Sequence, residues 1–443
     1  MAGQERRFGL WLAATVLAGL VGLAGSGATI EAQRNGDAEH WVGTWATAPV
    51  GRALTPPPAA PDAGRGAQRA AAAPLSVQNQ TLRQIVHTTI GGSRARVVFS
   101  NAFGNQPLAI GAAHVALRDK QAAIVAASDR PLTFAGRPSA TIPPGAALFS
   151  DPVTLTVPPF SDVAVDLYLP GDTAGSPSPV TFHNGARQTN YVSPEGNHAG
   201  AAEMPVQTTT SSWFYLARVE VAASPGTGAV ALFGDSITDG YNSTPDTNNR
   251  WPDHFAQRLR GGSGAVARGV LNLGIDGNQV LHDGAGVSAL ARFDRDVLVQ
   301  SGITHIVVLE GINDLGMQRN PRPTVEDLAF GHTQLIARAR ARGLRILGAT
   351  LLPYEGTIFP GYYSAEGDAV RQQFNEWLRT SHAYDGVIDF DAVMRDPAHP
   401  ARMLPQYDSG DHLHPNDAGY AMMARSVNVA LFNGPERARK TGR

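Results

Sequence analysis

Hydrophobic and polar residues alternate with a period of two through much of the chain between residues 81 and 224. In the segment 162–169, for example, valine or leucine stands at every second position, and the segment 213–221 alternates in a similar way. Short segments of this kind, separated by Gly, Pro, Asn or Asp, are typical of half-buried strands in antiparallel sheets. No stretch of this region has convincing helical spacing. We therefore expect an all-β sandwich domain at residues 81–224.

The pattern changes after a Gly- and Pro-rich junction at residues 224–228. Short apolar runs, which are typical of buried parallel strands, now alternate with longer stretches of helical spacing. The expected strands lie at residues 229–233, 270–273, 305–309, 345–349 and 386–390, and the expected helices at residues 251–259, 325–342, 369–381 and 415–431. Because strands alternate with helices, residues 228–434 are predicted to form a three-layer α/β/α sandwich with a five-stranded parallel sheet.

The N-terminus has the layout of a secretory signal peptide. Arg6 and Arg7 precede an apolar segment from Phe8 to about Leu23, and small residues follow, as expected before a cleavage site. We assign residues 1–32 to this signal and expect a secreted or periplasmic protein with no integral membrane domain after cleavage. An uncleaved anchor helix is the alternative, which the short, Gly- and Ala-rich run disfavours.

Two further segments belong to neither predicted domain. Residues 33–80 hold a Trp-x-x-x-Trp motif at residues 41–45, followed by a stretch rich in Pro, Ala and Gly. That composition buries little apolar surface and predicts an exposed loop or linker. Residues 435–443 are basic and are expected to form a disordered tail.

Composition narrows the possible partners and chemistry. The 443-residue chain has a formal net charge of −2 and no basic patch interleaved with aromatic residues, so nucleic acid is not an expected partner. The chain contains no cysteine, which excludes disulfides, thiolate metal sites and a cysteine nucleophile. An exported protein of this kind must be stabilised by core packing alone.

Three places in the predicted α/β domain present polar or flexible residues where a buried strand ends. Ser236 follows the first strand, Gly277 follows the second and Asn313 follows the third. Glycine at position 277 allows a backbone N–H to approach a ligand closely. Since open α/β sheets bind ligands at the carboxyl ends of their strands, these three residues are expected to meet at one edge of the sheet.

A candidate base lies near the C-terminus, in the sequence Asp-x-x-His-Pro that contains Asp411 and His414. In a tight turn, the aspartate can bond one ring nitrogen and leave the other free to take a proton from a serine. Asp396 and His399 repeat this spacing, but they do not precede a predicted helix. We therefore favour the pair Asp411 and His414.

Taken together, these blocks resemble the GDSL or SGNH hydrolase family along the predicted α/β domain. The resemblance implies a flavodoxin-like SGNH-hydrolase sandwich in which Ser236 is the nucleophile, His414 the base and Asp411 the residue that orients it. It further implies an oxyanion hole made by the backbone N–H groups of Ser236 and Gly277 and the side-chain amide of Asn313. A Gly-x-Ser-x-Gly motif, which marks the nucleophile-elbow hydrolases, does not occur in the chain.

The N-terminal part is similar to a narrower group. The Trp-x-x-x-Trp motif and the segment 91–101 resemble secreted bacterial members that carry a β-domain ahead of the hydrolase. That subgroup is associated with acetylxylan-esterase or arylesterase activity, which implies a small-molecule or polysaccharide ester with a short acyl group as substrate. Asp239 and Trp251, on either side of the loop 241–250, are expected to line the substrate cleft, although a plain surface loop fits the sequence equally well.

Two other classes of function stay open at this point. The chain could be an inert protein on the same fold that binds glycan or a cell surface through its β-domain. Metal-assisted hydrolysis is the other alternative, because His412 and His414 form a His-x-His pair. No complementary cluster of ligand residues stands out elsewhere, so we expect neither a metal nor a cofactor.

Overall fold

The computed structural model describes residues 39–52, 75–261, 267–317 and 320–433. The expected signal peptide, most of the Pro- and Ala-rich stretch and the basic tail lie outside these residues. Among the described residues, no helix combines the length and the apolar character that crossing a membrane requires.

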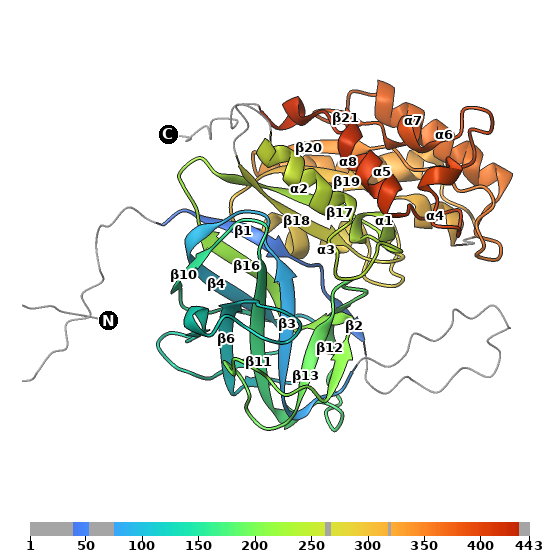
Figure 1. The fold of residues 1–443 in the computed structure, drawn as a ribbon. Coiled ribbons are helices and arrows are strands. Elements are labelled where there is room, and N and C mark those ends of the chain that lie inside the picture. The colour runs from blue at the N-terminus through green and yellow to red at the C-terminus, as the bar shows by residue number, and fades with distance from the viewer. Residues whose placement is uncertain (1–38, 53–74, 262–266, 318–319, 434–443) are drawn as a thin grey trace, which may run out of the picture. The chain divides into compact units, whose positions relative to one another are not determined.

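The described part of residues 41–222 is an all-β region, as the alternating pattern predicts (Figure 1). Its one described helix is the short η1 (Ala126–Ser128). One sheet contains β1 (Trp41–Ala46), β16 (Leu216–Ala222), β4 (Gly92–Ser100), β10 (Val153–Val157) and β9 (Ala147–Phe149), and a second contains β14 (Thr208–Thr210), β13 (Asn190–Glu195), β3 (Gln78–His87), β11 (Asp162–Asp172), β6 (Ala112–Leu117) and β7 (Arg130–Pro131). Two smaller sheets contain β15 (Ser212–Phe214), β12 (Val180–Asn184) and β2 (Val50–Arg52), and β5 (Leu108–Ile110) with β8 (Ala140–Ile142).

Strand β11 shows how the alternation builds this region. Val163 and Val165 belong to the main hydrophobic core, whereas Ala164 belongs to a second, smaller cluster, because successive side chains of a strand point to opposite faces. Asp166 is also buried, and its carboxylate pairs with the guanidinium of Arg83 at 2.7 Å. Buried charges need such partners. Both faces of the strand are therefore covered.

The α/β region contains the predicted five-stranded parallel sheet. Its strands follow the order β18 (Arg268–Gly274), β17 (Gly228–Gly234), β19 (Ile303–Leu309), β20 (Arg345–Ala349) and β21 (Val387–Ile388). The first strand, β17, is buried along its whole length and pairs with both β18 and β19. The loops that leave these three strands are therefore neighbours at one edge of the sheet.

Helices cover both faces of this sheet (Figure 1). The helices of this region are α1 (Ser236–Asp239), α2 (Trp251–Gly261), α3 (Ala289–Phe293), η2 (Asp294–Leu298), α4 (Ile312–Gly316), α5 (Val325–Ala341), α6 (Ala365–Thr380), α7 (Phe390–Met394), η3 (Pro405–Tyr407), α8 (Asp417–Ser426) and η4 (Val429–Phe432). The strand order reverses direction after β18, and right-handed crossovers then place α2 on one face and α3, α5 and α6 on the other. Consistent with this, α2 packs against α8, whereas α5 packs against α6 and α3.

Two predicted elements are shorter than the sequence suggested. The last strand ends at Ile388 because Asp389 starts α7, where its carboxylate accepts a hydrogen bond from the N–H of Ala392. The expected helix at 415–431 is divided into α8 and η4, because Asn416 and Asn428 each cap a separate helix. Asn side chains favour such cap positions.

The Trp-x-x-x-Trp motif forms β1, which packs directly on the α/β region. The N–H of Gly43 donates to the carbonyl of Ser301 at 3.0 Å, and a Cβ on Gly269 of β18 would lie only 2.1 Å from the carbonyl oxygen of Gly43. Because Gly269 has no side chain, the two backbones can touch. Residues His40–Arg443 form one compact unit, and the domain boundaries at 81–224 and 228–434 stay a prediction.

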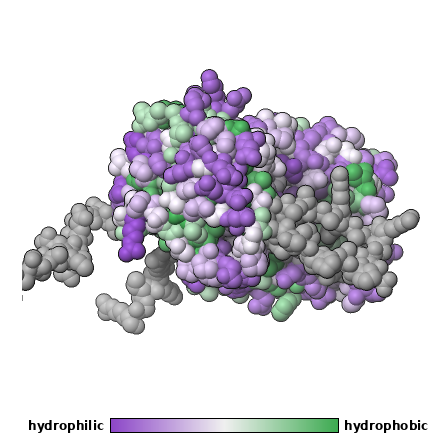
Figure 2. Space-filling model, turned by 90° about the horizontal axis from the view of Figure 1, so that it is seen from below, coloured by the Kyte–Doolittle hydropathy of each residue, from purple (hydrophilic) through white to green (hydrophobic). Residues whose placement is uncertain are grey.

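The described surface is mixed in character. Figure 2 shows polar residues over most of the face that it draws, with apolar residues scattered among them. The large apolar side chains that are exposed in the described part of the chain are Val125, Phe149, Val206, Val299, Phe330 and Ile358. Single exposed apolar residues of this kind are normal for folded proteins.

The contact between β1 and β18 gives a first prediction. Gly269→Ala should lower the free energy of unfolding by about 1–3 kcal/mol, because the new methyl group overlaps a backbone oxygen that cannot move independently. Gly171→Ala is the matched control, since a Cβ there meets no atom within 4 Å. Urea unfolding of both variants measures the difference, and equal stabilities would contradict the close contact.

Candidate active site

Ser236 lies at the turn between β17 and α1. Asp235 caps the short helix, because its carboxylate accepts a hydrogen bond from the N–H of Ile237 at 2.9 Å. Gly234 is required just before this turn, since a Cβ at that position would lie 2.1 Å from the hydroxyl oxygen of Thr238. The nucleophile candidate is thus held by local geometry at the carboxyl end of the first strand, and only 6% of Ser236 is exposed.

The structure brings together the three residues that the sequence proposed as a triad. Ser236 Oγ lies 2.8 Å from His414 Nε2, although the two residues are 178 positions apart. His414 Nδ1 lies 2.7 Å from Asp411 Oδ2. Because Asp411 bonds one ring nitrogen, the other is left facing the serine hydroxyl. This is the arrangement in which an imidazole can take a proton from a serine.

Asp411 is held as an ionised acceptor by its own turn. Its Oδ1 accepts hydrogen bonds from the N–H groups of Leu413 at 2.9 Å and His414 at 2.8 Å, and Asn242 Nδ2 donates to Oδ2 at 2.9 Å. Burial alone would raise the pKa of Asp411, but the hydrogen bond and charge of His414 and the two backbone N–H groups lower this pKa to about 2. Asp411 therefore stays negative at any pH at which the protein would work.

The two histidine alternatives have different surroundings. His399 bonds Asp396 at 3.3 Å, but its side chain is 63% exposed. His412 bonds Asp408, whereas His414 bonds Asp411, so the His-x-His pair does not share partners. Among the described residues, no group of three or more His, Cys, Asp or Glu side chains is arranged to hold a metal ion.

Gly277 and Asn313 lie on loops that are tied to each other. Gly277 has a positive φ of 74°, a conformation that favours glycine. Asn313 Nδ2 donates to the carbonyl of Asn278, the next residue, at 2.8 Å. Asp314 accepts the N–H groups of Val280 and Leu281. The loops after β18 and β19 are therefore joined, as strand adjacency predicts.

The sequence did not single out three residues that contact the candidate site residues. The ring of Tyr241 packs at a tilt against the His414 ring with a centroid separation of 4.4 Å, Asn242 bonds Asp411, and the hydroxyl of Tyr362 donates to Asn313 Oδ1 at 2.8 Å. The first two lie in the loop 241–250 that the sequence pointed to. Tyr362 belongs to an aromatic-rich loop, but that signal alone names no partner.

A buried arginine, also missed, links the ends of the three strands. Arg292 donates to the carbonyls of Gly234 and Leu273, each at 2.9 Å, and to Asn278 Oδ1 at 2.7 Å. It also pairs with Glu310 at 3.1 Å. Nearby, burial raises the pKa of Asp235 to about 7, and the charge of Asp314 adds to this effect.

Asp239 and Trp251, which the sequence placed at the substrate cleft, are both buried. Trp251 is only 1% exposed and packs its ring against Phe390 in the core, because it begins the inward face of α2. Asp239 is also buried, and its Oδ1 lies 3.0 Å from Nε2 of His183, a residue of β12. The expectation that Asp239 and Trp251 line the substrate cleft stays a prediction.

The β-region contacts the loop that follows Ser236. Arg187 places its guanidinium over the ring of Tyr241, 4.6 Å from the centroid. Gln188 and Thr189 donate to the carboxylate of Asp246 at 2.6 Å. The same Tyr241 ring packs on His414. Residues of the loop after β12 therefore support the loop that contacts His414.

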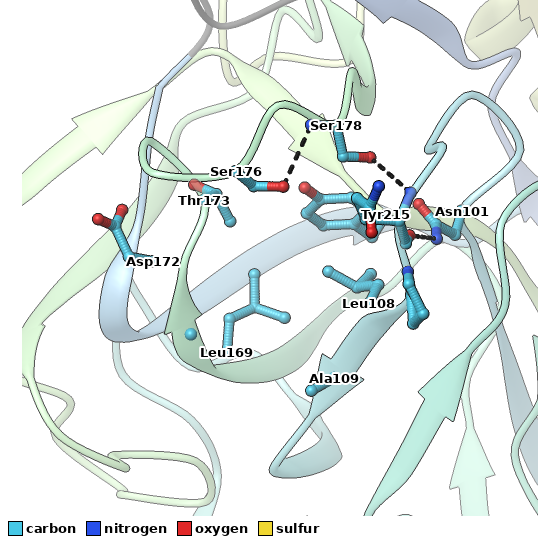
Figure 3. A pocket seen from close by; sticks show the side chains of 12 residues that line it. Asn101, Leu108, Ala109, Leu169, Asp172, Thr173, Ser176, Ser178 and Tyr215 are labelled. Atoms are coloured by element: carbon cyan, nitrogen blue, oxygen red, sulfur yellow. Dashed lines mark hydrogen bonds between the residues drawn. The ribbon is translucent and has the colours of Figure 1, made fainter.

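One cavity in the β-region is separate from these residues. It has a volume of about 240 Å³, and Leu108, Leu169 and Tyr215 are among the residues that line it (Figure 3). Several polar groups in its wall are bonded to neighbouring loop atoms, since Ser176 Oγ accepts the N–H of Ser178. None of the triad or oxyanion-hole candidates lines it.

The model of the GDSL-like Lipase/Acylhydrolase family matches residues 232–422. No curated protein sequence matches the chain. The match to the family model spans the turn at Ser236, the loops with Gly277 and Asn313, and the turn that holds Asp411 and His414.

Solved structures that are similar to part of the chain include three hydrolases. The M. smegmatis aryl esterase is 16% identical, with a TM-score of 0.37, and the match covers 45% of this chain and 96% of that chain. A carbohydrate acetylesterase from Sinorhizobium meliloti is 15% identical, with a TM-score of 0.36 and coverage of 45% and 96%. A lipase/acylhydrolase from Enterococcus faecalis is 20% identical, with a TM-score of 0.37 and coverage of 47% and 95%.

The family match and the observed fold of the same residues agree. The five-stranded parallel sheet and the four sequence blocks lie in one continuous part of the chain. Residues 232–422 therefore form a domain of the GDSL-like lipase/acylhydrolase family.

Proposed function

We propose that this protein is a secreted serine esterase that hydrolyses carboxylic esters through an acyl-enzyme intermediate. The observation that carries the proposal is the 2.8 Å contact between Ser236 Oγ and His414 Nε2, with Asp411 on the other ring nitrogen. Secretion is proposed from the N-terminal sequence. The intact set of groups favours an enzyme over an inert binding protein, because each member has the partner that its chemical role requires.

In the first half of the reaction, Ser236 Oγ attacks the ester carbonyl while His414 Nε2 takes the hydroxyl proton. His414 then gives that proton to the leaving alcohol, and an acyl group stays on Ser236. In the second half, His414 removes a proton from water, the resulting hydroxide equivalent attacks the acyl-enzyme, and Ser236 recovers its proton. Asp411 stabilises the imidazolium in both halves without itself taking the proton.

The negative charge that develops on the carbonyl oxygen needs hydrogen-bond donors. The N–H groups of Ser236 and Gly277 and the amide of Asn313 are the proposed donors. Support comes from the hydrogen bond between Asn313 and Asn278, which keeps the amide beside the Gly277 loop. A short acyl group suits this site, since Ser236 and His414 are only 6% and 4% exposed and aromatic rings flank His414.

The nucleophile is tested by Ser236→Ala. The variant should lose both the burst and the steady-state release of p-nitrophenol from p-nitrophenyl acetate, because no other hydroxyl contacts His414 Nε2 among the described hydrogen bonds. Stopped-flow absorbance measures both phases. Continued turnover by the variant would place the nucleophile elsewhere.

The oxyanion hole is tested by Asn313→Ala. Loss of one such donor lowers kcat by roughly 10²- to 10³-fold, and KM should change little because the donor acts mainly on the transition state. Steady-state kinetics with p-nitrophenyl acetate give both constants. An unaltered kcat would remove Asn313 from the oxyanion hole.

The choice between the two Asp-x-x-His pairs is tested by Asp411→Asn beside Asp396→Asn. The first should lower kcat by roughly 10³- to 10⁴-fold, because the amide favours the wrong imidazole tautomer. The second should leave kcat unchanged, since its partner His399 is mostly exposed. Because the pKa of Asp411 is about 2, the protonation of Asp411 should not lower the kcat of the wild type above pH 4. A fall in wild-type kcat above pH 4 that is caused by the protonation of Asp411 would contradict this.

A further inference from the structure

The amide of Asn313 can help an oxyanion in only one of its two orientations. Its nitrogen end donates hydrogen bonds, whereas its oxygen end only accepts them. A rotation of the side chain by half a turn would therefore exchange a stabilising N–H for a repelling oxygen at the same place. The presence of Asn313 alone does not fix this orientation. Two hydrogen bonds of the side-chain amide fix it.

The hydrogen bonds at both ends of the Asn313 amide favour the same orientation of the side chain. Nδ2 donates one of its two hydrogens to the carbonyl of Asn278 at 2.8 Å, which leaves the second hydrogen available. Oδ1 accepts the hydroxyl of Tyr362 at 2.8 Å. The carbonyl of Asn278 only accepts, so the rotated amide would place two oxygens together. The hydroxyl of Tyr362 gives the buried Oδ1 the donor that it needs.

We propose that Tyr362 is a positioning residue of the oxyanion hole, which acts by holding the Asn313 amide with its N–H toward the substrate carbonyl. This inference rests on the proposed function. Hydrogen bonds in a chain also polarise one another, so donation to Oδ1 makes the N–H of the same amide a better donor. Tyr362 thus acts through Asn313 and need not touch the substrate.

The surroundings of Tyr362 keep it in this role. Its ring lies against Gly316, where a Cβ would be 2.2 Å from Tyr362 Cζ, and Gly316 is three residues after Asn313 on α4. Tyr362 also packs in a small cluster with Ile312 and Leu413. The glycine therefore allows the ring to reach along the helix to the amide.

The hydroxyl of Tyr362 stays protonated at all relevant pH values. Burial raises its pKa well above the usual value, and the negative charges of Asp235, Asp314 and Asp411 add to that effect. Because a phenol donates only while it carries its proton, this environment makes the tyrosine a permanent donor.

The chain offers a matched control in Tyr354. Its ring packs edge-on against Tyr362 with a centroid separation of 5.9 Å, and it belongs to the same cluster. Its hydroxyl is also buried, but it has no hydrogen-bond partner among the described residues. Replacing either tyrosine with phenylalanine removes one buried hydroxyl, yet only Tyr362→Phe removes a hydrogen bond to Asn313.

The experiment compares the full-length wild type, Tyr362→Phe, Tyr354→Phe, Asn313→Ala and the double variant Asn313→Ala/Tyr362→Phe with p-nitrophenyl acetate. Tyr362→Phe should lower kcat about tenfold with KM unchanged, because the Asn313 amide then loses the hydrogen bond that holds its N–H toward the oxyanion. Tyr354→Phe should match the wild type. In the Asn313→Ala background, Tyr362→Phe should have no further effect, since the residue that it positions is gone.

A second measurement, of inhibitor binding, does not depend on turnover and can be made on variants with very low kcat. Inhibition by phenylboronic acid, which forms a tetrahedral adduct with an active-site serine, should weaken about tenfold in Tyr362→Phe and remain at the wild-type level in Tyr354→Phe. Equal inhibition of Tyr362→Phe and Tyr354→Phe by phenylboronic acid would overturn the role of Tyr362. So would an equal loss of kcat on Tyr362→Phe in the wild-type and Asn313→Ala backgrounds. Turnover by Ser236→Ala would instead overturn the proposed function, so the two failures are distinguishable.

Discussion

The buried guanidinium of Arg292 is the interaction on which the geometry of the site depends. It donates to carbonyl oxygens at the ends of β17 and β18 and to the side chain of Asn278, and it pairs with Glu310 at the end of β19. A buried charge of this kind is tolerated only when its donors are satisfied. The network therefore holds three strand ends in one arrangement, and the loops with Ser236, Gly277 and Asn313 start from these ends.

The β-region adds a second level of support. His183 of β12 bonds the carbonyl of Ala48 and Asp239 of α1, and Arg187 covers Tyr241, which packs on His414. The loop after Ser236 is thus held between the two regions. Because β1 also packs closely on β18 at Gly269, the β-region contributes to the rigidity of the site.

The order of strands and helices and the residues of the proposed triad could be read from the sequence because each depends on a local pattern. A short apolar run ended by glycine placed Ser236 after a strand, and the spacing of Asp411 and His414 allowed a turn that both hydrogen bonds confirm. The burial of Trp251 and Asp239, by contrast, was not predicted. A loop position says little about which way a side chain points once the chain folds back on itself.

The sequence by itself determined the five parallel strands, the preceding all-β region and the set of groups that could perform acyl transfer, since periodicity and short motifs act over a few residues. Only the tertiary structure decided which distant groups support them. The bond from Tyr362 to Asn313 spans 49 residues and that from His183 to Asp239 spans 56. Such pairs arise from strand order and loop packing, and hydrogen bonds between residues so far apart leave no periodic trace in the chain.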